Sequence, residues 1–224
     1  MDSEQLAAIR TKPTKLDVAE MVLSVFVMAF GVVLTVKSCQ GVGPISSLPY
    51  VLSEVFGLTL GTLTFIVYVC FILIQWAIYR DRGMYLRTLS QLPFTLIYSL
   101  FVDLIQMGLS SWTVEGLAMQ WLVILAALFL TALAIVMEVD ANVSMLADDG
   151  LILAVHRATR VPFDRCVILV NISFVVSAFL ISWFVLGGLY GVGLGTIFVG
   201  VAQGFVVKGL TPLFKRYRKG GHLD

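Results

Sequence analysis

The sequence predicts an all-α integral membrane protein whose six transmembrane helices form an inverted 3+3 repeat. A short broken or re-entrant helix is expected after the first span of each half. Three observations predict this fold class: an apolar composition, long runs without charge, and basic residues clustered between alternate runs. Hydrophobic residues make up 59% of the 224 residues and charged residues 13%, whereas soluble domains carry about 25% charged residues. The core of a water-soluble protein cannot bury this excess of apolar residues.

Runs without charged residues give the positions of the spans. A charged side chain at the centre of a bilayer is costly, and a spanning helix needs about 20 apolar residues. The first four predicted spans are Met21–Val36, Leu58–Tyr79, Thr88–Val102 and Gly116–Met137. A further run, Val167–Val207, has 41 residues without a charge, which is enough for two helices. The glycine-rich stretch Gly187–Gly193 is expected to form the turn between them.

Basic residues predict an orientation with both termini in the cytoplasm. Of the 15 lysines and arginines, 13 fall in the segments that this orientation places inside. These are Arg10, Lys12, Lys15, Arg80, Arg82, Arg87, Arg157, Arg160, Arg165, Lys215, Arg216, Arg218 and Lys219. The outer connections at 108–117 and 187–191 have none, in agreement with the positive-inside rule. We expect one transmembrane domain, 1–224, with repeats at about 18–110 and about 117–213 and a basic cytoplasmic tail at 214–224.

Two segments are too long for tight loops and too apolar for solvated ones. They are Cys39–Gly57, after the first span, and Asp140–Phe163, after the fourth. In the first, Gly41–Pro44 interrupts any helix, and Ser46 or Ser47 can cap the short helix that follows. In the second, Asp148 and Asp149 supply an acidic cap. Each segment either re-enters the membrane or lies flat on its surface as an amphipathic connector.

Placing the two segments in register gives an internal repeat. An offset of 103 residues aligns four identities: Val36 with Val139, Leu48 with Leu151, Val67 with Val170 and Phe71 with Phe174. The shared order of elements is stronger evidence, because each half has a long helix, a broken segment and two long helices. Since each half holds three spans, the second half enters the membrane from the opposite face. Interrupted segments in corresponding places of inverted repeats are typical of secondary transporters.

The stretch GVVLTVKSCQGVGPISSLPYVLS of the first half, with MEVDANVSMLADDGL and GLGTIFVGVAQG of the second, resembles the YczE/YitT-like family of bacterial membrane proteins. The resemblance covers roughly residues 20–212. It implies a six-helix, multi-pass protein of the bacterial cytoplasmic (inner) membrane. The second-half loop of that family has a Pro-Gly-Glu-Gly pattern where this chain has Ala147-Asp148-Asp149-Gly150. Asp149 thus has a carboxylate at the place of the glutamate in the family pattern.

Polar side chains in or beside the spans are the candidate binding residues. Such side chains are energetically unfavourable in a bilayer unless they pair with another polar group or are hydrated. The substrate-binding candidates are Ser46, Ser47, Tyr50, Asp103, Gln106, Glu138, Asn142, Asp149, Asn171 and Gln203. Asp103 is expected to be a proton- or cation-linked carboxylate or to reach the outer headgroups. Glu138 and Asp149 belong to an oxygen-rich stretch suited to a cation, a substrate amine or protons, unless nearby arginines neutralise it. The hydroxyls after Gly43 bind an anion or merely cap a helix.

Enzyme signatures are absent from the sequence. His156 and His222 are its two histidines, and no HExxH, GxSxG or P-loop spacing occurs. The three cysteines are scattered, which favours neither a disulfide framework nor a metal site. We therefore expect no enzymatic activity and no metal, and the sequence leaves any cofactor unknown.

The sequence predicts a small secondary transporter or permease for a small polar or charged solute. Its site is expected where the two broken segments approach the membrane midplane. Two alternatives stay open: a substrate-binding subunit of a larger importer, and a non-transporting membrane accessory protein. The expected partners are the lipid bilayer, a small solute and a second copy of the chain in a homodimer. A net charge of +1 gives no reason to expect a nucleic-acid partner.

Overall fold

The computed structural model describes residues 13–80 and 82–220, which form helices joined by turns and loops, without strands. Six helical stretches among these residues are long and apolar enough to cross a membrane. The all-helical class and the six spans predicted from the sequence are confirmed at this level. Arg10, Lys12 and the last four residues of the basic tail lie outside the described ranges.

The first half of the described chain forms five helices: α2 (Lys15–Lys37), α3 (Pro44–Phe56), α4 (Leu60–Tyr79), α5 (Arg82–Leu89) and α6 (Gln91–Gly108). α2 begins with a capping box, in which the side chains of Thr14 and Asp17 each accept a hydrogen bond from the other's backbone N–H. α3 opens at Pro44, where the missing N–H costs nothing, and stops at Gly57, whose φ is 65°. Local signals therefore set both ends of the short helix.

The second half forms four helices: α7 (Leu117–Ala141), α8 (Ala147–Thr159), α9 (Phe163–Ile181) and α10 (Leu194–Gly220). A π-helical turn, Ser182–Leu186, extends α9. Gly187 and Gly191 then adopt φ angles of 68° and 70°, so the glycine-rich stretch makes the turn that the sequence predicts. The hydroxyl of Ser182 fastens this turn by accepting a hydrogen bond from Tyr190 N–H at 2.7 Å.

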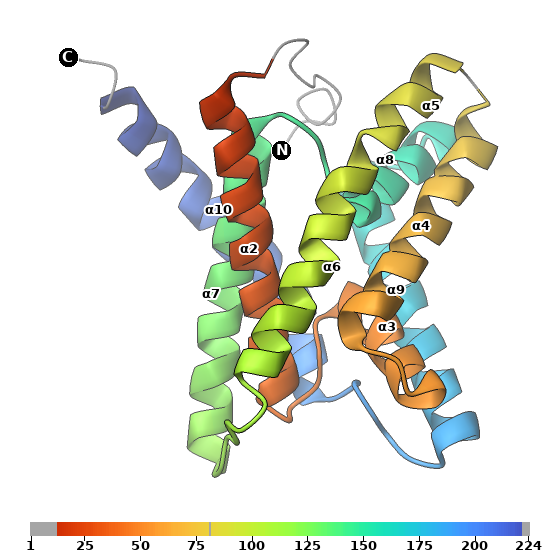
Figure 1. Cartoon of the computed structure of the whole chain (residues 1–224), viewed down its shortest axis with the longest axis vertical. Coiled ribbons are helices and arrows are strands. Elements are labelled where there is room, and N and C mark those ends of the chain that lie inside the picture. The colour runs from red at the N-terminus through yellow and green to blue at the C-terminus, as the bar shows by residue number, and fades with distance from the viewer. Residues whose placement is uncertain (1–12, 81, 221–224) are drawn as a thin grey trace.

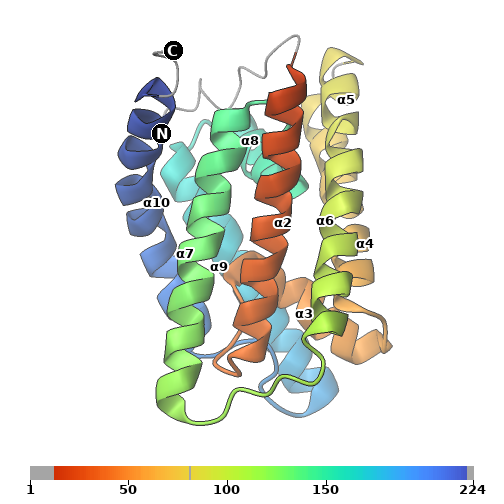
Figure 2. The same cartoon turned by 60° about the vertical axis from the view of Figure 1, so that its left-hand side comes forward.

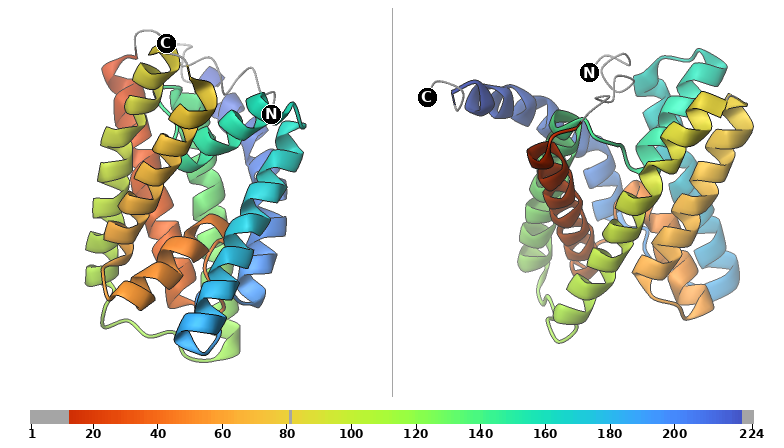
Figure 3. Two further views of the ribbon diagram at one scale, coloured as in Figure 1. Left: turned by 90° about the vertical axis from the view of Figure 1, so that its right-hand side faces the viewer. Right: turned by 45° about the horizontal axis from the view of Figure 1, so that its top comes forward.

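The long and short helices pack in two groups that are joined mainly through α6 (Figures 1 and 2). In the α2 group, α2 packs on α6 and α7, and α7 packs on α10. In the α4 group, α4 and α9 each pack on both short helices, α3 and α8. Contacts of α4 with α6, of α3 with α10 and of α6 with α8 connect the groups. Figure 3 shows the two groups from two further sides.

Aromatic rings connect the groups through the buried core. Tyr98 of α6 stacks on Tyr68 of α4 with ring centroids 5.8 Å apart, and Tyr68 stacks on Phe71 at 5.4 Å. Phe71 in turn contacts Phe174 of α9 at 5.0 Å. The last two spans differ from this core: within an apolar stretch of 18 residues in each, only 11% of the residues in the α9 span and 6% of those in the α10 span are buried. These two helices present apolar side chains to the surroundings, as expected of helices that face lipid.

Candidate functional site

The first turns of the two short helices lie at the contact between α4 and α6. The hydroxyl group of Tyr98 interacts with Ser46 of α3 and with Tyr68 of α4. Asp148, in the first turn of α8, also interacts with Tyr68. Glu138 of α7 lies close enough to Asp148 and Asp149 to interact with their charges. We call these residues the central cluster: Ser46, Tyr68, Tyr98, Glu138, Asp148 and Asp149.

Two glutamine side chains fix the start of α8. Gln75 of α4 and Gln91 of α6 exchange amide hydrogen bonds, with donor-acceptor distances of 3.2 and 3.1 Å. Gln75 Nε2 also donates to the carbonyl oxygen of Ala147 at 3.1 Å. Gly150 packs directly on this pair, because a Cβ there would lie 2.7 Å from Gln75 Oε1. The first turn of α8 is therefore held against both α4 and α6.

Glu138 connects the end of α7 with the start of α8. Its side chain is 5% exposed, and its Oε1 accepts a hydrogen bond from the backbone N–H of Leu146 at 2.8 Å. Leu146 is the N-cap residue of α8, so this bond brings the carboxyl group to the first turn of that helix. Asn142 ends α7 with a φ of 50°, a left-handed conformation that asparagine tolerates, and turns the chain into this loop. Asn142 thus shapes the approach to the cluster.

Asp148 and Asp149 are half-buried carboxyl groups. Burial raises the pKa of Asp148, against a smaller lowering by hydrogen bonds from the backbone N–H groups of Asp148 and Asp149 and from the Tyr68 hydroxyl. Burial, and then the charge of Asp148, raise the pKa of Asp149 to about 8. Burial and the neighbouring Asp148 therefore favour the protonated, uncharged form of Asp149.

Two buried oxygen atoms at this place have no hydrogen-bond partner in the described part of the chain. They are Asp148 Oδ1 and Thr95 Oγ1. Thr95 is 0% exposed and lies one helical turn from both Gln91 and Tyr98, on the face of α6 that meets α4 and α8. An unpaired buried polar atom costs about 1–3 kcal/mol. A ligand that supplies the missing partners recovers this cost.

Comparison with known proteins gives a family without a known activity. Residues 16–212 match DUF6198, which is described as a family of unknown function. The chain belongs to the DUF6198 family. No curated protein and no solved structure matches it. The matched range contains the whole central cluster of this DUF6198 protein.

Three of the ten predicted binding residues lie in the central cluster: Ser46, Glu138 and Asp149. Ser47 is next to it in sequence but points elsewhere, because its hydroxyl donates to the carbonyl oxygen of Pro44 at 2.6 Å and is fully buried. In this DUF6198 protein the expected capping of α3 by Ser46 or Ser47 is wrong: Gly43 is the N-cap residue, no side chain caps the helix, and Ser47 bonds a carbonyl oxygen within the first turn.

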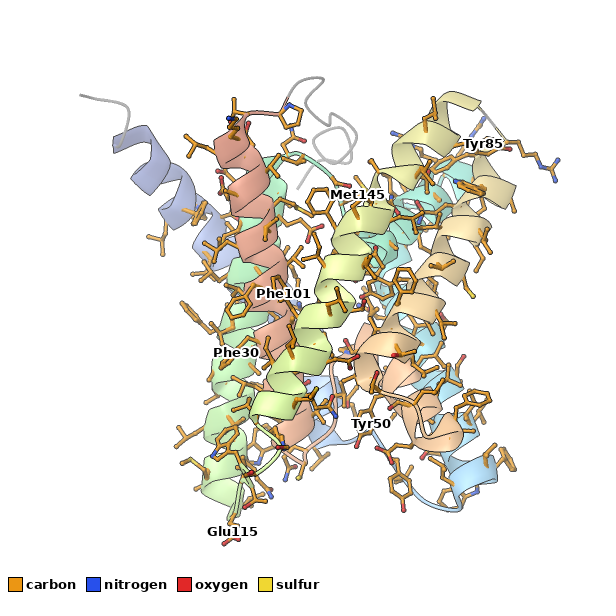
Figure 4. The ribbon with its side chains drawn as sticks, in the orientation of Figure 1. Phe30, Tyr50, Tyr85, Phe101, Glu115 and Met145 are labelled. Carbon is orange, nitrogen blue, oxygen red and sulfur yellow. The ribbon has the colours of Figure 1, made fainter. Side chains whose placement is uncertain are left out.

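The other candidates of the DUF6198 chain lie elsewhere on the helices. Tyr50 interacts with Glu54, and burial together with that charge raises its pKa to about 12. Figure 4 shows Tyr50 far below Met145, which lies in the loop before α8. Gln106 on α6 and Asn171 on α9 each carry a buried, unpaired side-chain oxygen, and Gln203 is half-buried on α10. These three amides lie outside the central cluster as defined here.

Sequence reasoning overlooked Tyr68, Tyr98 and Thr95 as binding candidates. Each lies within an apolar run, where aromatic and β-branched residues are ordinary core components. The available signal was spacing: Gln91, Thr95 and Tyr98 follow each other at one-turn intervals and therefore share one face of α6.

Asp103 has a structural role that neither sequence interpretation included. Its Oδ1 accepts a hydrogen bond from Gly61 N–H at 2.7 Å, and its Oδ2 accepts one from the Thr59 hydroxyl at 2.7 Å. Thr59 is the N-cap residue of α4. The carboxylate thus joins α6 to the positive end of α4 and satisfies an N–H group that the helix leaves free.

Replacing Asp103 by alanine is expected to lower the free energy of unfolding by about 1–2 kcal/mol, because the N-terminus of α4 loses this cap. Thermal melting of the purified DUF6198 protein in detergent measures the effect. Leu104→Ala is the control, since Leu104 is the neighbouring residue of α6 and is exposed. Equal melting temperatures for Asp103→Ala and the parent protein contradict the capping role.

Gly150→Ala is expected to cost about 1–3 kcal/mol of stability through overpacking. The new Cβ would displace the amide pair of Gln75 and Gln91, and so loosen the start of α8. Gly209→Ala is the matched control, because nothing lies within 4 Å of a Cβ at Gly209. Melting curves of the two variants should separate clearly, and a stable Gly150→Ala protein refutes the tight contact.

Proposed function

We propose that this protein is a small secondary transporter whose two inverted halves enclose a substrate site at the central cluster. The proposal is supported by one observation above all: the residues of the central cluster come from both helix groups. Tyr98 and Glu138 belong to the α2 group, whereas the other four residues belong to the α4 group. A site shared by two helix groups changes shape when one group moves against the other, which is the basis of alternating access.

An offset of 103 residues relates the helices of the two halves. It is the separation of Pro44, the first residue of α3, from Ala147, the first residue of α8, and each of these helices has 13 residues. The same offset carries the first residue of α4 onto that of α9, and the first residue of α6 onto that of α10. The contact of α2 with α6 in the first half corresponds to the contact of α7 with α10 in the second. In the same way, the contact of α3 with α9 corresponds to the contact of α8 with α4. These matches support the inverted 3+3 repeat.

The short helices re-enter the membrane instead of lying on its surface. α8 has five consecutive buried residues, Gly150–Ala154, so protein surrounds this part of the helix on all sides. An amphipathic connector at the membrane surface buries one face only. Residues 144–146, the non-helical backbone directly before α8, are buried within the protein, where such backbone is tolerated at membrane depth.

One contact breaks the correspondence between the halves and suggests the motion. α4 packs extensively on α6, but within the described residues the equivalent helices, α9 and α10, make no comparable contact (Figures 1 and 3). Inverted halves in different conformations generate the opposite-facing state when they exchange those conformations. In that second state α9 closes on α10 and α4 separates from α6, so that the central cluster opens to the other side.

The proposed location is the bacterial cytoplasmic membrane, with the start of α2 and the end of α10 in the cytoplasm. Both lie at the same end of the molecule in Figure 1, as six spans require. A reporter fused after Arg165 should then be cytoplasmic, and one within 110–116 external; the reverse result refutes this orientation. The kinship with YczE/YitT-like proteins remains a prediction.

A ligand screen followed by uptake tests the proposed function. The purified protein is melted in the presence of small metabolites and ions, and each stabilising solute is assayed for uptake into proteoliposomes. We expect stabilisation and uptake to be lost together in Ser46→Ala and Asp149→Asn. Glu115→Gln is the control, since Glu115 is an exposed acid in the loop between α6 and α7 (Figure 4). If no solute stabilises the protein and none is taken up into proteoliposomes, the transporter proposal is refuted and an accessory protein is favoured.

A further inference from the structure

The central cluster combines unpaired oxygen atoms with an excess of acid. Thr95 Oγ1 is completely buried, and Asp148 Oδ1 is a buried acceptor; neither has a hydrogen-bond partner in the described chain. Thr95 lies between Gln91 and Tyr98 on α6, and both of those side chains face the first turn of α8. The orphaned hydroxyl therefore lies on the face of α6 that meets α8, and the orphaned carboxyl oxygen belongs to the first turn of α8.

The charge of the site selects among ligand classes. The interactions of Glu138, Asp148 and Asp149 within the described chain are with hydrogen-bond donors and with one another. An anion finds no attractive partner among these acidic groups, and it disfavours their ionised form. A cation favours the ionised form, because it pairs with each carboxylate that gives up its proton.

The donors required by the site select among cations. No group of three or more histidine, cysteine or acidic side chains in the described residues is arranged to hold a metal ion. The orphaned atoms need partners that donate hydrogen bonds in fixed directions, as N–H groups do. Tyr68 and Tyr98, whose rings stack on each other where α4 meets α6, supply apolar surface that suits an alkyl group.

Building on the transport function proposed above, we infer that the substrate is a small protonated amine or guanidinium. Its N–H groups donate to Asp148 Oδ1 and Thr95 Oγ1, and the carboxyl groups of the central cluster compensate its charge.

Binding of the cation releases a proton. The O–H bond of the Asp149 carboxyl group breaks, the proton passes to water, and the carboxylate pairs with the ammonium group, so that the net charge of the site is unchanged. Asp149 is faced by Asp148 of α8, Glu138 of α7 and Tyr68 of α4, and Tyr98 of α6 faces Asp148. These groups set its proton affinity. The two opposite-facing states then exchange the amine for a proton.

A charge series with one carbon skeleton tests the substrate class. The purified protein is titrated with propylammonium, propanol and propionate, and with methylammonium, guanidinium and K⁺. We expect the organic cations alone to raise the melting temperature and to release protons, detected with a pH dye in weak buffer. Stabilisation by propanol or propionate equal to that by propylammonium overturns the inference, and so does the absence of stabilisation by every amine and guanidinium.

Variants at Thr95 separate ligand binding from folding. Thr95→Val removes the hydroxyl at nearly constant volume, and we expect propylammonium to bind about tenfold more weakly. The ligand-free melting temperature should stay equal or rise, because the lost hydroxyl had no partner. Thr95→Ser keeps the hydroxyl and should bind like the parent. A Thr95→Val protein with unchanged affinity overturns the assignment.

Asp149→Asn is expected to weaken propylammonium binding at least tenfold and to abolish proton release.

Flux in proteoliposomes distinguishes the two proposals. If propylammonium binds as described without crossing the membrane, transport is refuted and the binding site stands. If propanol or propionate is carried and no amine binds, transport stands and the substrate class is refuted.

Discussion

A Gly61→Val protein should lose about 3 kcal/mol of its free energy of unfolding, the upper end of the usual cost of overpacking. Gly61 lies where α4 packs closely on α6. A Cβ there would collide with the backbone oxygen of Ser99 and lie 2.5 Å from Asp103 Cγ. Backbone cannot rotate away as a side chain can, so the two helices must separate and the cap on α4 must weaken.

Thermal melting in detergent measures this loss, with Gly204→Val as the control. Gly204 also lies inside a helix, and a Cβ there has nothing within 4 Å, so the same residue change leaves packing intact. The ligand-induced rise in melting temperature should also shrink in Gly61→Val, because the α4 and α6 contact carries Tyr68 and Tyr98. If both variants melt alike, the close approach of these helices is refuted.

The stability of the protein is expected to fall as pH rises from about 4 to about 8. The folded-state pKa of Asp149 is raised to about 8, whereas the pKa of an unfolded aspartate is about 3.8. Between these values the folded state binds more protons than the unfolded state, and stability therefore decreases with increasing pH. The raised pKa of Asp148 acts in the same direction. Melting temperatures across this pH range should decline by several degrees.

Asp149→Asn isolates the contribution of this carboxyl group. Asparagine resembles the protonated acid in size and carries no charge at any pH. The variant should match the parent at the acidic end and melt higher at the alkaline end, with a flatter pH profile. Glu115→Gln should keep the parent's profile. A parent profile that rises with pH across this range, or that Asp149→Asn does not flatten, refutes the protonated state of the site.

The long helices were predictable because their signals are local and strong. The charge-free runs gave six spans, and the glycines from Gly187 to Gly193 gave the turn before α10. Boundaries shifted where caps outweigh hydropathy: α7 continues past Glu138 to Ala141 because the left-handed Asn142, rather than the first charged residue, ends it. α2 begins at Lys15 for the same reason, since the capping box at Thr14 precedes the apolar run.

The site was predictable only in part, because its residues are assembled by packing. Glu138 and Asp149 stood out as acids beside spans. Asp103 looked similar in sequence, yet its partners Thr59 and Gly61 lie far away along the chain and make it a helix cap. Tyr68 looked like an ordinary core aromatic. Its role depends on the neighbouring turn of α8, and no local pattern reports that contact.

A cysteine cross-link between α9 and α10 tests the central claim most directly. Tyr68 and Tyr98 stack in the present state, and the 103-residue offset carries them onto Asn171 and Val201. We expect Asn171→Cys with Val201→Cys, in a chain whose native cysteines are replaced, to form a disulfide in the membrane, and we expect this disulfide to stop uptake until it is reduced. If oxidant produces no cross-link between these positions while uptake continues, the two halves do not exchange conformations, and the proposed alternating access is refuted.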